Sequence, residues 1–465
     1  MNLPPDFITF AKTFFASESE EFLQSLNRPA PTSIRINRAK IPDSIIRNPV
    51  PWASSAYYPD KRPIFTYDPL FHTGCYYVQE ASSMFLEQVF NQYIQSPVCM
   101  LDLCAAPGGK STHALSLLPE GSLLVSNDVI RSRADILVEN TTKWGYPNVI
   151  VTNNDASDFK RLTHFFDVVS VDAPCSGEGL FRKDPESVNQ WSLNNISLCK
   201  ERQQRILRDI WPCLKPGGLL IYSTCTYNTK ENEENIERLL NTFDAEILPI
   251  RHEKTWNIST PVHPNIYRFF PHKVAGEGFS LSLIRKNDEE SRHPIRIKTS
   301  PNKKQSPVVP DIKDRLIHPE KFRFSVKNNI ITAFPEEIVP RYETIRSMLK
   351  IISAGITLAE IKGKDLSPGQ SSATSIYLNK NKFETIEIDY KQALHYLCKE
   401  MLVLPPETPV SHLLVNYKNH PLGFVKNIGN RANNLYPQDW RIRTRYLPEE
   451  ETIVINTDSQ EPALP

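Results

Sequence analysis

The sequence predicts an α/β protein built around a doubly wound parallel sheet, with a small α+β domain before it and a β-rich domain after it. Short apolar runs alternate with helical stretches between residues 98 and 225, a glycine pair follows the first of these runs, and the polar, proline-bearing segment 285–311 sets off the rest of the chain. Strands that alternate with helices form a mostly parallel sheet with helices on both faces.

The composition limits the class of protein. A chain of 465 residues is long enough for about three domains. Its 54 Lys and Arg nearly balance its 53 Asp and Glu, so an anionic partner needs a local basic surface. The eight cysteines are scattered without metal-ligand spacing, which predicts reduced thiols and no metal. Without a signal-peptide pattern or an apolar run of roughly 18 residues, we expect a cytoplasmic monomer that binds no membrane.

Residues 1–95 predict a small N-terminal domain that binds RNA. Phe7, Phe10, Phe14 and Phe15 have helical spacing after two prolines, which favours a helix. The alternating segment "PTSIRINRAK" and the β-rich "CYYV" predict strands, and a helix is expected from about Glu80.

Residues 96–286 contain the expected central sheet. Its strands are predicted in "VCMLDLC", "LLVSNDV", "VIVTNND", "DVVSVDAP" and "GGLLIYSTC". Ligands of such sheets bind beyond the carboxyl ends of the strands. One edge of the sheet is therefore the candidate site, because each strand is followed there by a chemically active residue: Cys104, Asp128, Asp155, Asp172 and Cys225.

The remaining third of the chain predicts separate units. Residues 287–312 are interpreted as a linker. An intermediate domain is expected at 313–390, with a helical pattern near "ETIRSMLKIISAG", and a β-rich domain at 391–450, with strands at "HLLVNY" and "PLGFVKNI". Residues 451–465 form a tail.

The glycine loop favours a nucleoside without a polyphosphate. Gly109, Lys110 and Ser111 match the second half of a phosphate-binding loop, but Cys104 stands where its first glycine is required. Asp128, 19 residues after Gly109, is placed to bind ribose hydroxyls. Asp155, at the end of the next strand, is placed to bind the exocyclic amine of adenine. Two alternatives stay open. One is an ATPase in which "VVSVDAP" supplies the apolar strand and the acid that hold magnesium. The other is that the strand-end acids serve only as turn formers or helix caps.

Cys175 and Cys225 suggest covalent chemistry, since each follows a predicted strand on the ligand side. A thiolate that adds to carbon 6 of a pyrimidine makes carbon 5 nucleophilic toward a methyl donor. Asp172 and Lys110 are the groups expected where negative charge grows on the ring. A base must then remove the carbon 5 proton before the thiolate leaves. This chemistry leaves open which cysteine attacks.

Six motifs follow one another in the central part: "DLCAAPGGKSTHAL", "VSNDV", "NNDAS", "DAPCSGEGLFRKDPE", "CLKPGGLLIYSTCTYNTKENEENI" and "PHKVAGEGFSLSLI". In this order they resemble the catalytic core of the Sun/Fmu-type RNA 5-methylcytosine methyltransferases. "PTSIRINRAK" and "GCYYVQEASSM" are similar to the segments that precede that core, so the resemblance extends over residues 32–286.

The resemblance implies a Rossmann-like S-adenosylmethionine-dependent methyltransferase core. It implies that Cys225 is the nucleophile, that Cys175 assists product release, and that Asp172 and Lys110 lie near the cytosine. It also implies a set of residues that bind S-adenosylmethionine: Cys104, Ala105, Ala106, Pro107, Gly108, Gly109, Lys110, Asp128, Arg133, Asp155 and Asp172.

The C-terminal third resembles the extension found in the ribosomal small-subunit branch of that family, which ends in a PUA-like RNA-binding domain. "PLGFVK", "NNLYPQDWR" and "ALHYL" carry this resemblance, whereas "LSPGQSSATSIYL" replaces an expected proline-serine-histidine segment. Independently, basic and aromatic residues are interleaved between residues 416 and 446, and we expect them to bind phosphates and stack on unpaired bases. The alternative is a solvated basic face around an ordinary core. These residues are Lys418, Lys426, Arg431, Arg441, Arg443 and Arg445, with Tyr417, Phe424, Tyr436, Trp440 and Tyr446.

These observations predict S-adenosylmethionine-dependent methylation of cytosine C5 in RNA, with 16S rRNA, alone or in the small ribosomal subunit or its precursor, as the partner. The target base must leave its stack to reach a thiol. A tRNA is the alternative substrate. The alternative from another class is a non-catalytic RNA-binding assembly factor. A protein that only binds RNA has no need of two thiols beside a methyl donor, so the two thiols argue against this alternative.

Overall fold

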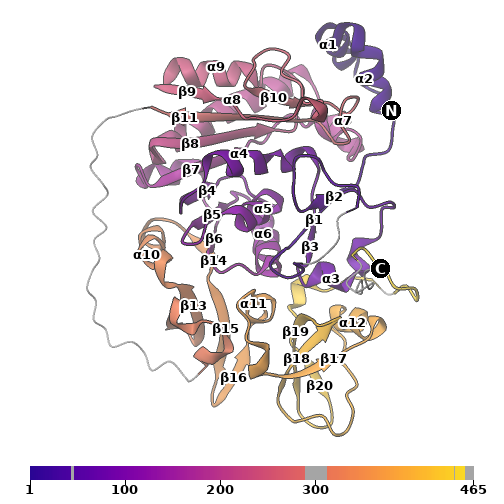
Figure 1. Cartoon of the computed structure of the whole chain (residues 1–465), viewed down its shortest axis with the longest axis vertical. Helices are drawn as coiled ribbons and strands as arrows, with labels where there is room; N and C mark the ends of the chain where they lie inside the picture. The colour runs from indigo at the N-terminus through magenta and orange to yellow at the C-terminus, as the bar shows by residue number, and fades with distance from the viewer. Residues whose placement is uncertain (43–46, 288–311, 445, 456–465) are drawn as a thin grey trace, which may run out of the picture.

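The computed structural model describes residues 1–42, 47–287, 312–444 and 446–455. Most of the expected linker 287–312 and the end of the expected tail therefore lie outside the described residues. Figure 1 shows the N-terminal helices and the central sheet in the upper part of the molecule, with the C-terminal third below the sheet.

The central sheet is the largest element of the described chain. Its nine strands run in the order β10-β11-β8-β7-β4-β5-β6-β14, and β9 pairs with β11. The five strands from β8 to β6 are parallel, which confirms the α/β prediction. The bounds are β4 Cys99–Asp102, β5 Leu123–Asn127, β6 Val149–Thr152, β7 Phe166–Asp172, β8 Leu214–Thr224, β9 Ala245–Leu248, β10 Ile266–Phe269, β11 Phe279–Lys286 and β14 Ile351–Ala354.

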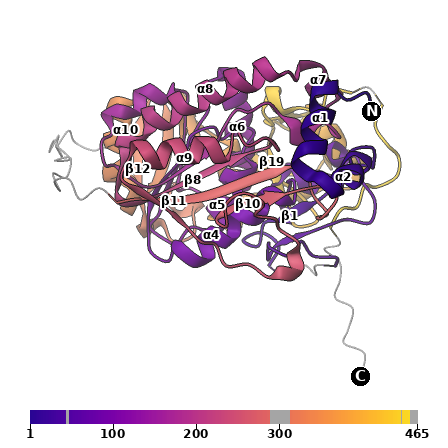
Figure 2. The same ribbon diagram turned by 90° about the horizontal axis from the view of Figure 1, so that it is seen from above.

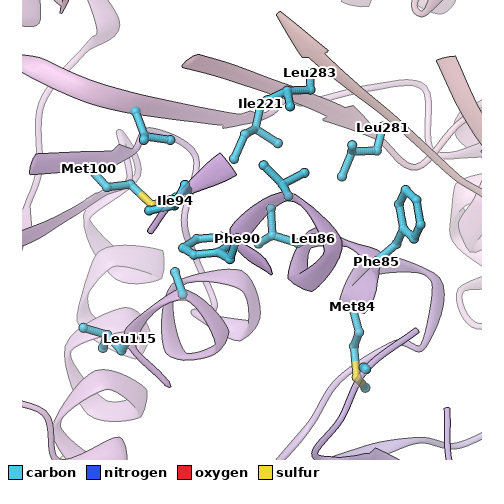
Figure 3. Close-up of a cluster of buried hydrophobic side chains, with 14 of the residues drawn as sticks. Met84, Phe85, Leu86, Phe90, Ile94, Met100, Leu115, Ile221, Leu281 and Leu283 are labelled. Carbon is cyan, nitrogen blue, oxygen red and sulfur yellow. The ribbon is translucent and has the colours of Figure 1, made fainter. Parts of the chain in front are cut away.

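Helices cover both faces of this sheet (Figure 2). Apolar residues of α4, α5 and α6 contact one face, and those of α8, α9 and α10 contact the other. Figure 3 shows Phe85, Leu86 and Phe90, at and around the start of α4, among Met100, Ile221 and other strand residues. The bounds are α4 Leu86–Tyr93, α5 Gly109–Leu117, α6 Arg131–Trp144, α7 Pro185–Gln190, α8 Leu193–Ile210, α9 Glu233–Thr242 and α10 Val339–Met348.

Local sequence determines where the longest covering helix begins and which face it buries. Ser192 caps α8 by accepting a hydrogen bond from the Asn195 amide at 3.1 Å. Ile196, Ile206 and Ile210 are buried on one side of the helix. Each buried aliphatic side chain stabilises the fold by about 1.5–3 kcal/mol, so this apolar stripe holds α8 against the sheet.

The N-terminal region packs on two other parts of the chain. Its first helices pack on the central part, and Ile34, Leu70 and Tyr76 share a buried core with residues between 413 and 425 of the C-terminal third. The predicted helix is present as α1, Pro5–Phe15, followed by α2, Ser19–Ser25. Phe7 packs edge-on against Trp191, with ring centroids 5.6 Å apart. The helix expected from Glu80 begins later, as α4, and covers the central sheet. The remaining elements are β1 Ile34–Ile36, β2 Ala56–Tyr57, α3 Pro69–His72 and β3 Tyr76–Val78.

The predicted helix at "ETIRSMLKIISAG" is only half correct. Helix α10 ends at Met348, and Ile351–Ala354 forms β14, which pairs antiparallel with β6. The reason is tertiary: β6 leaves an open edge, and β-branched Ile351 and Ile352 suit a strand there. The segment 339–354 thus extends the central sheet and its cover, although it lies in the expected intermediate domain.

Two further four-stranded sheets occupy the C-terminal third, in the orders β12-β13-β15-β16 and β17-β18-β19-β20. The strands predicted at "HLLVNY" and "PLGFVKNI" are present as β18 and β19. The bounds are β12 Phe322–Lys327, β13 Ile330–Pro335, β15 Ile356–Lys362, β16 Asp365–Pro368, α11 Gln370–Thr374, β17 Glu384–Glu387, α12 Tyr390–Leu397, β18 His412–Tyr417, β19 His420–Asn427 and β20 Ala432–Asn434. Within the described residues, no helix is long and apolar enough to cross a membrane.

Candidate active site

The loops after β4, β5, β7 and β8 meet at one edge of the sheet. The Leu103 amide donates to the Ser170 carbonyl at 2.9 Å, and the Ala105 amide to the Asn127 carbonyl at 2.8 Å. The Ala173 amide donates to the Ser223 carbonyl at 2.8 Å. These bonds continue the parallel ladder beyond the strands, so the side chains that follow the strand ends share one site.

The glycine loop of residues 104–109 turns sharply into α5. Gly108 has a φ of 115°, and a Cβ there would lie 3.1 Å from Leu137 Cδ1, so both conformation and space favour glycine. Arg133 Nη2 donates to the Ala106 carbonyl at 2.8 Å and lies 3.5 Å from Asp128 Oδ2. Arg133 therefore holds the loop beside Asp128.

Asp128 and Asp155 have different surroundings. The Asp128 side chain is 4% exposed, and its Oδ1 accepts a hydrogen bond from the Ile130 amide at 2.9 Å. Asp155 is 39% exposed and caps the 3₁₀ turn Ala156–Arg161, where its Oδ1 accepts from the amide and hydroxyl of Ser157. Asp155 thus caps this turn through one of its two carboxylate oxygens.

Lys110 and Asp172 form an ion pair in the middle of the site. Lys110 Nζ lies 2.9 Å from Asp172 Oδ2, while Asp172 Oδ1 accepts from the Ser223 hydroxyl at 2.8 Å. Burial lowers the pKa of Lys110, but the facing carboxylate outweighs it, and the net shift is upward. The lysine that would hold phosphates in an ATPase is therefore a permanent cation paired with a carboxylate.

The two cysteines are in direct contact. Cys175 Sγ lies 3.0 Å from Cys225 Sγ, and both residues are half-buried. The hydrogen bond with Cys225, burial, and the nearby carboxylate of Glu231 all raise the pKa of Cys175 well above its ordinary value. Gly179 allows this approach, because a Cβ there would lie 2.8 Å from the Cys225 carbonyl. All eight cysteines are free, and no cluster of metal ligands occurs among the described residues.

Sequence reasoning missed the polar groups behind the two cysteines. Glu178 and Glu231 are completely buried, and hydrogen bonds connect them to Asn228 and Gln203. Glu178 lies within the quoted "DAPCSGEG", which was a usable signal. Glu231 belongs to the acidic run "TKENEEN", which is typical of a solvated surface.

A third buried acid, Asp102, also escaped sequence reasoning. Its Oδ2 accepts from the Ser111 hydroxyl at 2.6 Å, and burial raises its pKa to about 6. Asp102 ends β4 and Ser111 lies in α5, so this bond joins the strand to the helix on either side of the glycine loop.

Three family models match the chain in order. The model "16S rRNA methyltransferase RsmB/F" matches residues 93–285, the N-terminal domain of 16S rRNA methyltransferase RsmF matches 3–81, and the methyltransferase RsmF PUA domain matches 383–442. Together they cover well over half of the chain. The chain belongs to the RsmB/F methyltransferase family.

Curated relatives of this RsmB/F family member agree over its length. A ribosomal RNA small subunit methyltransferase F from Serratia proteamaculans is 27% identical, over 94% of this chain and 96% of the relative. One of the same name from Aeromonas salmonicida is 29% identical, over 90% and 93%.

Solved structures show the same fold. A methyltransferase homologue from Pyrococcus horikoshii is 28% identical, with a TM-score of 0.51 over 59% of this chain and 93% of that chain. NSun6 from Pyrococcus horikoshii, solved with SFG, is 19% identical, with a TM-score of 0.52 over 62% and 99%. As an RsmB/F family member, the chain is an S-adenosylmethionine-dependent RNA methyltransferase with a Rossmann-like core and a C-terminal PUA domain.

The site suits S-adenosylmethionine. Asp128 accepts a single hydrogen bond from the backbone, so its carboxylate retains acceptor capacity for a ribose. Lys110, which a polyphosphate would need, is already paired with Asp172.

The expected base-stacking role is wrong for three aromatic residues of the PUA domain. Tyr417, Phe424 and Tyr436 are 3%, 1% and 0% exposed and belong to the core. Trp440 is half-buried, and Tyr446 is 87% exposed. Both faces of this sheet are buried, so Tyr417 of β18 and Phe424 of β19 lie in two different cores, and Tyr436, which follows β20, packs in the same core as Tyr417.

The expected basic surface is also smaller than the sequence indicates. Lys418 pairs with Glu451 at 2.7 Å and Lys426 with Asp365 at 2.6 Å. Arg431 and Arg443 are exposed, Arg441 is half-buried, and Arg445 lies outside the described residues. Arginines near the end of the domain are thus the cations best placed for a phosphate backbone.

Proposed function

We propose that this protein methylates C5 of a cytosine in 16S rRNA through a covalent adduct between Cys225 and carbon 6 of the base. The observation that carries the proposal is the contact of two thiols, 3.0 Å apart, at the strand-end edge that also holds the Lys110–Asp172 ion pair. The names of the curated relatives support the choice of rRNA.

In the proposed mechanism, Cys225 Sγ forms a bond to carbon 6 and Lys110 stabilises the negative charge that grows on the ring. S-adenosylmethionine, when bound, supplies an electrophilic methyl group. After carbon 5 has accepted the methyl group, a base, for which water suffices, takes the carbon 5 proton, the electrons of that C–H bond reform the ring double bond, and the bond between carbon 6 and sulfur breaks with Cys225 leaving as a thiolate. Cys175, in contact with Cys225, assists this release.

We further propose that the glycine loop and the strand-end acids bind the donor. Asp128 would accept from the ribose, and Arg133 keeps the loop in place. The proposed binding residues are Cys104, Ala105, Ala106, Pro107, Gly108, Gly109, Lys110, Asp128, Arg133, Asp155 and Asp172. Because Cys225 is half-buried, the target base has to leave its stack, and unpaired RNA should be preferred over a stable duplex.

The test uses total rRNA from cells that lack this protein, with tritiated S-adenosylmethionine. Wild type should label one cytosine of 16S rRNA. Cys175→Ala should accumulate a protein–RNA adduct that withstands a denaturing gel, and the adduct should vanish in Cys175→Ala/Cys225→Ala. The matched control is Cys398→Ala, a half-buried cysteine of the C-terminal third that should behave as wild type.

Three other outcomes would contradict parts of the proposal. An adduct that survives the loss of Cys225 would refute the assignment of the nucleophile. Methylation of tRNA without methylation of rRNA would leave the reaction but refute the substrate. If no RNA is methylated, the chain is a non-catalytic assembly factor.

A further inference from the structure

The loop that contains Cys175 is fixed on both sides of the thiol by one pair of residues. Glu231 Oε2 accepts a hydrogen bond from the Ser176 amide at 3.1 Å and from Gln203 Nε2 at 2.7 Å. The same Gln203 nitrogen donates to the Pro174 carbonyl at 3.0 Å. Glu231 therefore holds Ser176, the residue after Cys175, and Gln203 holds Pro174, the residue before it.

Glu231 itself belongs to the loop that contains Cys225. Its Oε1 accepts from Asn228 Nδ2 at 2.8 Å, and its amide donates to Asn228 Oδ1 at 2.9 Å. In return, Glu178 of the Cys175 loop accepts from the amides of Tyr227 and Asn228 at 2.7 and 2.9 Å. Each cysteine loop thus sends a buried carboxylate into the other, and this arrangement sets the distance between the thiols.

The charges around the two thiols are of opposite sign. In the described chain, the bonds to the Glu231 and Glu178 carboxylates all come from neutral amide and indole donors. The Lys110 ammonium interacts with Cys225. The titratable groups of the described chain that face the pair from the packed elements are Lys110, Asp172, Glu178, Glu231, Tyr222 of β8, Tyr227 of the Cys225 loop and Cys199 of α8.

We propose that Glu231 is a positioning residue that keeps Cys175 as a neutral thiol, with its S–H directed at Cys225. The inference rests on the proposed function in that Cys225 is the attacking thiol. Cys175 then acts as a hydrogen-bond donor: it stabilises the Cys225 thiolate before attack and again when the bond between sulfur and carbon 6 breaks. Burial and the Glu178 carboxylate raise the pKa of Glu231 above its ordinary value, and the hydrogen bonds that its carboxylate accepts from Ser176, Asn228 and Gln203 limit this rise. The two thiols are chemically similar, and their surroundings give them different roles.

The first test needs neither RNA nor methyl donor. In Cys225→Ala protein, the rate of Cys175 alkylation by iodoacetamide is measured against pH, with the modified peptide quantified by mass spectrometry. Adding Glu231→Gln, which keeps the shape and removes the charge, should lower the midpoint by about one pH unit, so alkylation below the midpoint is roughly tenfold faster. Glu87→Gln, a buried carboxylate next to His113, should leave the midpoint unchanged. An unchanged midpoint in folded Cys225→Ala/Glu231→Gln protein would overturn the inference.

The second test keeps the carboxylate charge at position 231 and shortens the side chain by one methylene group. Glu231→Asp in otherwise wild-type protein should slow the decay of the covalent adduct in a single turnover by about tenfold or more, while in the Cys225→Ala background it leaves the alkylation midpoint in place. Adduct decay at the wild-type rate would refute the positioning role, even if Glu231→Gln fails to fold. If wild type forms no adduct with any RNA, the proposed function fails, whereas the alkylation result still decides what Glu231 does to Cys175.

Discussion

At the scale of single residues, the ion pair of Lys110 and Asp172 controls the electrostatics of the site. Both side chains are partly covered, with 17% and 35% exposure, and lie between the glycine loop and the two thiols. Asp172 keeps Lys110 charged against the effect of burial. The ring of Phe279, 5.2 Å from the ammonium, closes one side of the pair.

Asp172→Asn should reduce the methylation rate by about 10²-fold. The neutral amide leaves Lys110 without its counter-charge, so that burial lowers the pKa of the ammonium. Single-turnover kinetics would measure this. Ser223→Ala, which removes only the hydroxyl that donates to Asp172, is the control and should cost less than tenfold. Equal losses in the two variants would show that the geometry of Asp172 matters more than its charge.

The strand-end residues of the site could be predicted from sequence, because parallel strands bring their carboxyl ends together whatever the loops do. Cys175, Asp172 and Cys225 are such residues. Glu231 could not be predicted, since its burial depends on a second loop that folds over it from another strand. The inward direction of Tyr417 and Phe424 also depends on strand pairing, which the spacing of rings and charges does not encode.

At the scale of elements, α4 and α5 are joined by a buried polar contact within the apolar layer. His113 Nε2 of α5 lies 3.0 Å from Glu87 Oε2 of α4, and Glu87 Oε1 accepts from the Ser54 amide at 2.9 Å. Burial and the nearby Arg35 lower the pKa of His113 to about 4. Neutral His113 therefore donates to Glu87 and helps hold α5, which begins at the glycine loop.

This contact predicts acid sensitivity. An unfolded histidine has a pKa near 6.5, so between pH 6.5 and 4 the unfolded chain takes up a proton that the folded chain does not. The free energy of unfolding should fall as pH falls through this window, by up to about 3 kcal/mol from this residue. Urea unfolding at several pH values should show a smaller fall in His113→Gln. The same change at exposed His318 is the control, and an equal effect there would refute the assignment.

The covering helices follow from apolar periodicity, whereas β14 does not. The segment after Met348 is an apolar run too short to distinguish a helix from a strand. Its strand conformation depends on the open edge of β6, which is about 200 residues earlier in the chain. A sequence pattern shows only local periodicity, whereas the conformation of this segment is determined by β6, a strand far away in the chain.

At the scale of the whole molecule, the C-terminal third is attached to the catalytic part by more than the chain. Ile351 pairs with Thr152 and Ala354 with Ile150, and Ile345 of α10 lies in the core on the same face as α8. The Thr374 hydroxyl also donates to the Thr142 carbonyl at 2.7 Å. Figure 1 shows α10 and β14 against the lower side of the central sheet.

A chain cut between residues 288 and 311 should therefore stay assembled. A protease site inserted there and cleaved should leave two fragments that elute together in gel filtration and keep methyltransferase activity. Ser353→Pro disturbs the pairing of β14 with β6, and fragments with this change should bind each other more weakly, although the core that the N-terminal strands share with the PUA sheet remains. Separation of the unchanged fragments would show that the covalent connection is needed.

The pairing of β14 with β6 helps to fix the distance between the C-terminal third and the active site. Strand β14 of the C-terminal third continues the same sheet in which β7 ends at Asp172 and the two thiols follow β7 and β8. The PUA sheet in turn shares a buried core with Ile34, Leu70 and Tyr76 of the N-terminal region, so packing within the chain sets the span from the exposed arginines to Cys225. Under the proposed function, we expect an RNA bound at these arginines to present to the thiols nucleotides at that span, so that distance along the folded RNA contributes to the choice of the cytosine.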